Sequence, residues 1–248
     1  MNAIYILWLR QLKRHLRSRA RVIGSLGQPL LFLVALGFGF GPIYRRAGGG
    51  NYLQFLAPGI IAMAILFSGM FAGIEVIWDR QFGFLKETLV APVSRVSIMV
   101  GRTMGGATVA MMQGTIVLIL SLAVGFRPVS WATFPMALVF MFIVGFLFTA
   151  FGTALASVLE DMQGFQIIMN FLIMPIFFLS GALFPIAGAP RAIVLVATAD
   201  PLAYGVDGLR AVLAGNQHFG IGLDLLVLSI MTVVVLLVGA NLFSRIQV

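Results

Sequence analysis

Six long apolar segments limit what this chain can fold into. Each has at least about 20 mostly apolar residues, the length that an α-helix needs to cross the hydrocarbon core of a bilayer. They occupy residues 22–43, 53–78, 103–125, 132–158, 165–186 and 222–243. Because lipid offers the backbone no hydrogen-bond partner, such segments cross a membrane as helices. The sequence therefore predicts an all-α membrane protein with six transmembrane helices.

Composition supports a membrane class rather than a soluble one. Hydrophobic residues make up 60% of the chain and charged residues 10%, against about 45–50% and about 25% in an average soluble domain. A soluble fold of this length could not bury so much apolar surface, whereas transmembrane helices expose it to lipid. The absence of cysteine excludes a disulfide framework, a thiolate metal site and a cysteine nucleophile.

The distribution of basic residues predicts the orientation in the membrane. Six spans place both ends of the chain on one side, and that side carries most of the basic residues. It holds Arg10, Lys13, Arg14, Arg17, Arg19, Arg21, Arg80, Lys86, Arg95, Arg102 and Arg245, and the other side holds Arg45, Arg46, Arg127, Arg191 and Arg210. Since cytoplasmic segments accumulate Lys and Arg, we expect a multi-pass protein of the cell (plasma or inner) membrane with both termini in the cytoplasm. This rule also explains the net charge of +8 without nucleic acid.

The first 21 residues predict a basic amphipathic helix that precedes a single membrane domain, residues 22–248. On a helix, one face carries Arg10, Lys13, Arg14, Arg17 and Arg21, and the opposite face carries Ile4, Tyr5, Trp8, Leu9, Leu12 and Leu16. Such a helix lies in the membrane interface with its apolar face toward the lipid. It can serve as a lipid anchor that orients the chain or as a surface for a cytoplasmic partner, and the two roles are compatible.

The cytoplasmic loop 79–102 contains a second amphipathic segment. The sequence FLKETLV at 84–90 favours a short helix that Pro92 ends. Its apolar residues, Phe84, Leu85, Leu89 and Val90, leave one apolar face exposed. An apolar face in a cytoplasmic loop is typical of a partner surface; packing against the ends of the chain's own helices is the alternative.

Three charged residues, Glu75, Asp79 and Arg80, lie at the inner end of the second span. Glu75 and Asp79 are one helical turn apart and share a face. Ionisable groups in transmembrane helices are functional candidates, here as charges of an inner gate. A salt-bridged helix end is the alternative. No nucleophile accompanies the carboxylates, so hydrolysis is not indicated, and the two histidines, His15 and His218, are too far apart for a shared metal site.

Small residues recur at helical spacing in the second and third spans. Gly69 and Gly73 form a GxxxG pattern, and Gly101, Gly105 and Gly114 line one face of the third span. Such positions let helix backbones approach closely. We expect them to pack helices within the chain.

The outer segment 187–221 is too long for a tight turn. It contains an apolar stretch at 191–199, too short to cross, which indicates an interfacial or re-entrant helix. Just before it, Phe177, Phe178 and Phe184 gather near the outer end of the fifth span. They either line an outer pathway for an apolar substrate or form an aromatic belt.

The chain carries no ATP site of its own. A phosphate-binding loop needs the pattern GxxxxGK[ST], whose lysine and backbone amides hold the phosphates. The two lysines, Lys13 and Lys86, each follow a leucine. Any ATP that drives this protein must therefore be bound by another chain.

Three stretches in this order carry a resemblance to a known family: LAPGIIAM at 56–63, GFLKETLVAPVSR at 83–95, and FLSGALFPI through DPLAYGVDGLRAVL at 178–213. The chain resembles the ABC type-2 transport permeases, the membrane subunits of exporters of drugs, polysaccharides and teichoic acids. The resemblance covers essentially the whole length. It implies a type-2 ABC exporter fold and a permease subunit that is not an enzyme and binds no cofactor.

The resemblance also implies partners and roles. Two permease copies pair, and each docks on a cytoplasmic ATPase subunit that holds ATP and Mg. Residues 83–91 correspond to the coupling helix, which enters a groove of the ATPase through Phe84, Leu85, Lys86, Glu87, Thr88 and Leu89. Residues 1–21 correspond to the interfacial connecting helix, and residues 181–215 to re-entrant outer helices. The first, second and fifth spans are the expected interface and pathway elements.

Substrate class follows only coarsely from the residues. The apolar lining favours a hydrophobic or lipid-linked molecule, a drug-like one first. A polysaccharide or teichoic acid is the alternative, although three Trp and four Tyr offer few stacking side chains. A membrane subunit without a pathway and a lipid-modifying enzyme are the remaining readings. For the enzyme, Asp200 and Asp207 are the outer carboxylate pair, with no His, Lys or Ser clearly placed beside them.

Overall fold

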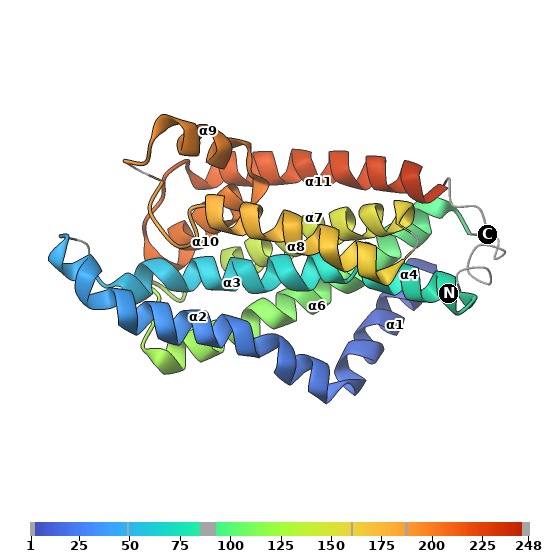
Figure 1. Cartoon of the computed structure of the whole chain (residues 1–248), viewed down its shortest axis with the longest axis horizontal. Helices are drawn as coiled ribbons and strands as arrows, with labels where there is room; N and C mark the ends of the chain where they lie inside the picture. Colours follow the sequence, from blue (N-terminus) through green and yellow to red (C-terminus); the bar gives the residue numbers. More distant parts are fainter. Residues whose placement is uncertain (1–2, 49, 85–92, 160, 187, 245–248) are drawn as a thin grey trace.

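The computed structural model describes residues 3–48, 50–84, 93–159, 161–186 and 188–244, and within these residues the regular elements are all helices. They form an elongated bundle, shown in Figure 1. The helices are α1 Ala3–Arg17, α2 Arg19–Arg46, α3 Tyr52–Phe71, α4 Ile74–Gln81, α6 Arg95–Val124, α7 Phe134–Val158, α8 Met162–Leu179, α9 Arg191–Ala199, α10 Pro201–Ala214 and α11 Ile221–Ser244.

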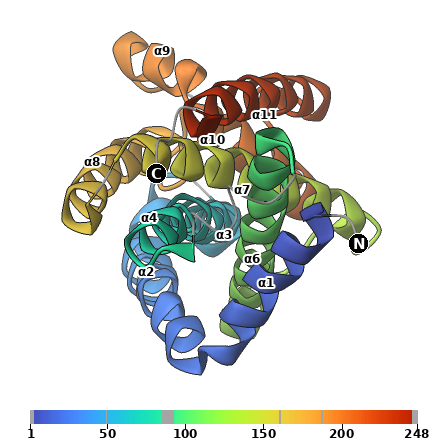
Figure 2. The same cartoon turned by 90° about the vertical axis from the view of Figure 1, so that its right-hand side faces the viewer.

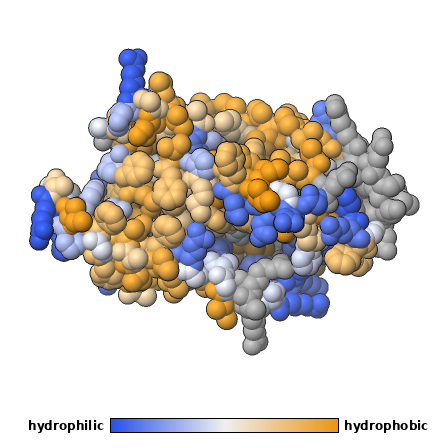
Figure 3. Space-filling model, in the orientation of Figure 1, coloured by the Kyte–Doolittle hydropathy of each residue, from blue (hydrophilic) through white to orange (hydrophobic). Residues whose placement is uncertain are grey.

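Among the described residues, six stretches are each long and apolar enough to cross a membrane, not counting the bent pair α9–α10, which confirms the predicted fold class. They are Val22–Arg46, Tyr52–Gln81, Arg95–Val124, Phe134–Val158, Met162–Leu179 and Ile221–Ser244. Hydrophobic residues cover much of the flank seen in Figure 3, as expected of a surface that meets lipid. The helix α1 begins and α11 ends at the same end of the bundle, and α9 and α10 lie at the opposite end (Figure 1).

The third span begins earlier than the sequence predicts. The helix α6 starts at Arg95, eight residues before the predicted boundary, so the second half of the predicted loop 79–102 is helical. Ser94 caps this start by accepting a hydrogen bond from the Ser97 backbone N–H. Arg102 does not end the hydrophobic helix, because an ion pair with Asp79 neutralises it.

The fifth span and the outer segment also divide differently. The helix α8 ends at Leu179, seven residues before the predicted boundary, because Gly181 takes a left-handed backbone conformation with φ of 76°. After it, α9 and α10 meet at an angle of 89°. Asp200 makes this bend: its side chain accepts from the Leu202 N–H, and Pro201 opens α10. A bent pair of this kind is either a broken span or a re-entrant loop, so the re-entrant form remains a prediction.

The helix α3 forms the centre of the bundle. Leu56, Ile60 and Ile65 are fully buried among its neighbours. The close packing expected of the GxxxG pattern occurs against α7: a Cβ added to Gly73 would collide with the carbonyl oxygen of Gly152, and one added to Gly69 would lie 3.1 Å from the Thr149 backbone nitrogen. These glycines set the distance between the second and fourth spans.

Candidate functional site

A buried carboxylate, Asp79, connects three helices at the end of the bundle that carries both termini. Its Oδ2 lies 2.5 Å from Nη2 of Arg102 on α6, and its Oδ1 lies 2.8 Å from Nη2 of Arg10 on α1. Asp79 is 4% exposed and Arg102 is equally buried. A buried ion pair tolerates the loss of neither partner, because the remaining charge would lack compensation. Asp79 therefore holds α1, α4 and α6 in one arrangement.

Two further contacts extend this charged cluster. Arg14 on α1 lies 3.8 Å from the Glu75 carboxylate, and its guanidinium lies 5.4 Å from the centre of the Trp78 ring. Arg80 donates to the backbone carbonyls of Ser157 and Leu159 at 3.0 and 3.2 Å. These carbonyls lie at the C-terminal end of α7, in its last turn and at its C-cap, where a helix favours a cation. The short helix α4 is thus fixed to α1, α6 and α7.

Two of the three charges proposed as an inner gate, Glu75 and Asp79, form ion pairs as in a salt-bridged helix end, and the gate role remains a prediction. Glu75, Asp79 and Arg80 each have a partner on a neighbouring helix. Sequence reasoning missed Arg102, because it placed this residue in a loop. The available signal was that residues 95–102 continue the helical pattern of the third span.

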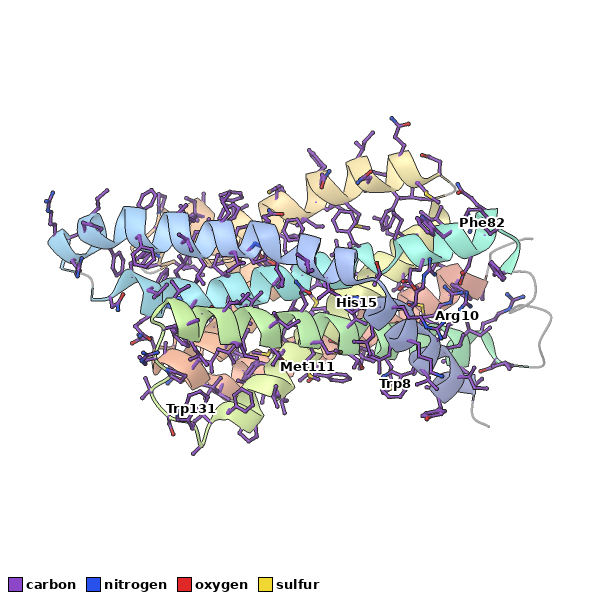
Figure 4. The ribbon with its side chains drawn as sticks, turned by 90° about the horizontal axis from the view of Figure 1, so that it is seen from below. Trp8, Arg10, His15, Phe82, Met111 and Trp131 are labelled. Atoms are coloured by element: carbon purple, nitrogen blue, oxygen red, sulfur yellow. The ribbon has the colours of Figure 1, made fainter. Side chains whose placement is uncertain are left out.

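The helix α1 rests on α6 through small residues. The Trp8 indole N–H donates to the Thr108 hydroxyl at 3.0 Å. A Cβ on Gly105 would lie 2.6 Å from the Gln11 Cβ, and one on Gly101 would lie 3.1 Å from the Ile4 Cα. Part of the apolar face assigned to lipid therefore packs on protein. Figure 4 shows Trp8 and Arg10 on this helix, at the end of the bundle opposite Trp131.

Two of the basic residues assigned to the N-terminal helix are exposed and could contact lipid or a partner protein. Lys13 and Arg17 are exposed, while Arg10 and Arg14 are committed to the acidic side chains of α4. The side chain of Arg21 lies outside the described residues. The surface left for lipid or for a partner is thus smaller than the sequence pattern indicates.

The expected coupling segment starts beside the charged cluster. Phe82 and Phe84 are both exposed, and the Phe84 ring centre lies 5.9 Å from the Arg10 guanidinium carbon. Leu85, Lys86, Glu87, Thr88 and Leu89 lie outside the described residues. Both flanks of the segment are described: it leaves α4 after Gln81 and enters α6 at Arg95. A force applied to it would act directly on the two helices that Asp79 joins.

The three phenylalanines of the expected outer pathway do not share one surface. Phe177 is fully buried, and its ring packs edge-on against Phe32 at 6.1 Å between centres. Phe178 and Phe184 are exposed to a similar degree. Phe177 therefore belongs to the core, and a pathway role remains a prediction for the other two.

Two buried charged residues at the outer end, Asp207 and Arg210, form hydrogen bonds to the backbone of neighbouring loops. The Asp207 carboxylate accepts hydrogen bonds from the backbone N–H groups of His218 and Phe219 at 2.7–2.9 Å. Arg210 donates to the Gly181 carbonyl at 3.0 Å and stacks on Phe55, with 3.9 Å to the ring centre. These partners anchor the loop after α10 and the turn after α8. Asp200 and Asp207 both accept hydrogen bonds from backbone N–H groups, which is a structural role.

Among the described residues, no three His, Cys, Asp or Glu side chains lie close enough together to hold a metal ion.

Comparison with known proteins identifies the family. The model of the "ABC-2 type transporter" family matches residues 2–214. Nodulation protein J of Rhizobium leguminosarum bv. viciae is 30% identical over 228 residues, which cover 91% of this chain and 87% of the relative. The transport permease ycf38 of Porphyra purpurea is 29% identical over 204 residues, covering 81% and 70%. The chain therefore belongs to the ABC-2 type transporter family and is a transport permease with several transmembrane helices.

Proposed function

We propose that this chain is the permease subunit of an ATP-driven exporter in the cell membrane. It moves a hydrophobic or lipid-linked molecule, with a drug-like molecule as the first candidate, out of the cytoplasm or the inner leaflet. The observation that carries the proposal is the family match over residues 2–214 in a sequence without a phosphate-binding loop. A separate ABC ATPase, present in two copies, supplies the ATP and Mg site.

The charged cluster supports a route by which movements of the ATPase are transmitted to helices α1, α4 and α6. The coupling segment 83–91 docks on the ATPase from the cytoplasmic side, where both termini also lie. Since this segment joins α4 to α6, and Asp79 links both helices to Arg10 on α1, ATP binding moves the three helices as one unit. The ATPase shifts the permease between two conformations to the extent that ATP-bound and ATP-free states favour different ones.

A second copy of this chain completes the pathway. The helices α2 and α8 flank α3 and α4 (Figure 2) and bury few residues against the rest of the chain. Their exposed side chains include Leu31 and Phe38 on α2 and Ile167 and Phe171 on α8. These faces offer an apolar surface to the second permease, with the first, second and fifth spans at the interface.

Substitution in the coupling segment tests this proposal. We expect Leu85→Asp combined with Glu87→Lys to abolish ATP-dependent export of a hydrophobic dye from proteoliposomes that contain the permease and its ATPase. A matched control places the same kinds of change, Arg127→Glu with Val129→Asp, in the exposed loop at the opposite end. Both variants should insert at normal levels. Export that persists in the first variant, or is lost equally in both, would contradict the coupling role.

A further inference from the structure

A cavity of about 450 Å³ lies inside one copy of the chain, between α1, α2, the α3–α4 pair and α6. Figure 2 looks along the bundle from the end that carries both termini and shows how these helices are arranged. Residues of α8 do not line it. The cavity therefore shares the first and second spans, but not the fifth, with the route expected between two copies.

The wall of this cavity contains a buried amide without partners. Gln113 in the middle of α6 is 2% exposed, and neither its Oε1 nor its Nε2 has a hydrogen-bond partner. Buried side-chain amides are nearly always satisfied, because an unpaired donor or acceptor loses its hydration without compensation. The free-energy cost of this lost hydration is larger in apolar surroundings, and the lining of this cavity includes Met63 and Phe67. A ligand that both accepts and donates would satisfy Gln113.

A second unpartnered donor lines the same cavity. The indole Nε1 of Trp78 is shielded from solvent and has no acceptor. Trp78 lies on α4, toward the end with both termini, whereas Gln113 lies deeper in the bundle. A ligand with more than one acceptor could reach both groups.

The remaining lining selects a neutral ligand. Its polar members are largely uncharged and include Gln11, Gln28 and Ser68, with His15 and Glu75 toward the end with both termini. Arg14 opposes the Glu75 charge at 3.8 Å and also covers the Trp78 ring at 5.4 Å. The carboxylate and the aromatic face that a cationic head group would need are thus already engaged. An anionic head group finds no unpaired cation among the described lining residues.

We propose that this cavity binds a neutral amphiphile whose head group carries hydroxyl or amide groups. The head group exchanges hydrogen bonds with the Gln113 amide, and the alkyl chain packs along Met63, Phe67 and Phe71. Binding of this amphiphile does not depend on transport; its identity as the exported molecule rests on the proposed function.

The absence of cysteine allows a direct test. Ser68→Cys places a single thiol in the cavity wall, and Thr198→Cys places one on the exposed surface of α9 at the opposite end. Each protein, in phospholipid nanodiscs, is alkylated with N-ethylmaleimide while octyl glucoside is titrated below its micelle concentration. Octyl phosphate and octyltrimethylammonium, with the same chain, test the head group. The assay needs neither ATP nor the ATPase, so its failure is distinguishable from failure of the transport proposal.

We expect octyl glucoside to protect Cys at position 68 saturably and to leave position 198 reactive. Adding Gln113→Leu should raise the half-protecting concentration by about tenfold, the scale of one lost pair of buried hydrogen bonds. Gln166→Leu, the same change at an exposed position on α8, should leave it unchanged. The melting temperature without ligand verifies that each variant is folded. Equal protection by all three head groups, no protection, or an unchanged half-protecting concentration in folded Gln113→Leu would overturn the proposal.

Discussion

Asp79 and Arg102 form a buried ion pair, with 2.5 Å between Oδ2 and Nη2, that joins the end of the second span to the start of the third. Asp79 precedes the expected coupling segment in the sequence, and Arg102 follows it. The helices on either side of this segment, α4 and α6, therefore cannot move independently without separating two buried charges. Arg10 adds the N-terminal helix to the same unit.

Removal of the Asp79 carboxylate should therefore destabilise the protein strongly. Asp79→Leu leaves Arg102 buried without a partner, and we expect a loss of about 3–5 kcal/mol. Arg10→Ala removes an arginine whose side chain is 41% exposed and should cost at most about 1 kcal/mol. Denaturant unfolding of the purified permease measures both. Joint replacement, Asp79→Leu with Arg102→Met, should recover much of the loss, and equal effects of the first two variants would refute the buried pair.

Close packing of α1 on α6 should fail when Gly105 is enlarged. A Cβ at this position would lie 2.6 Å from side-chain carbons of Gln11, so we expect Gly105→Leu to cost about 1–3 kcal/mol and to free the N-terminal helix for proteolysis. Gly27→Leu is the matched control, because nothing lies within 4 Å of a Cβ there. Limited trypsin digestion compares the two, and equal cleavage rates within residues 3–17 would argue against the packing of α1.

The outer loop should open when Asp207 is replaced. Its carboxylate accepts the N–H groups of both His218 and Phe219, and hydrogen bonds to a charged group contribute about 1.5–3 kcal/mol each. Asp207→Ala should therefore speed amide exchange at these two positions by at least about tenfold. Hydrogen–deuterium exchange with mass spectrometry measures this. Asp161→Ala, which removes one exposed cap on α8, should leave these amides unchanged.

Gln113→Leu should stabilise the protein in the absence of ligand. The substitution removes two buried groups that lack partners, and each such group costs about 1–3 kcal/mol. We expect a higher melting temperature than that of the parent protein. A lower melting temperature would show that the amide has a partner that stabilises the fold.

The sequence predicts the spans well because length and hydropathy are local properties. The segment that becomes α11 is mostly apolar, with Asp224 as its one charged residue, and its bounds shift by one residue at each end. A predicted boundary is wrong where a residue distant in sequence alters the effect of a charged residue. Arg102 is predicted to end a loop, but it lies within α6, where Asp79 neutralises its charge. Likewise, α8 ends early because of the backbone conformation of Gly181, which hydropathy does not report.

The candidate site depends on contacts between residues far apart in sequence, so less of it could be predicted. Glu75, Asp79 and Arg80 were identifiable as charges near a membrane helix, but their partners on α1, α6 and α7 were not. Phe177 is buried while Phe178 and Phe184 are exposed, a difference that the sequence alone does not reveal. The cavity beside Gln113 had no sequence signal beyond one polar residue in an apolar span.

The central claim is that this permease works as part of a complex with an ABC ATPase. The most direct measurement co-expresses the chain with an ABC ATPase encoded beside it, purifies the product in mild detergent, and determines its mass and ATP hydrolysis. The account predicts a stable complex with two copies of each chain, whose hydrolysis responds to hydrophobic substrates. A permease that purifies without any ATPase, while correctly folded and inserted, would contradict it.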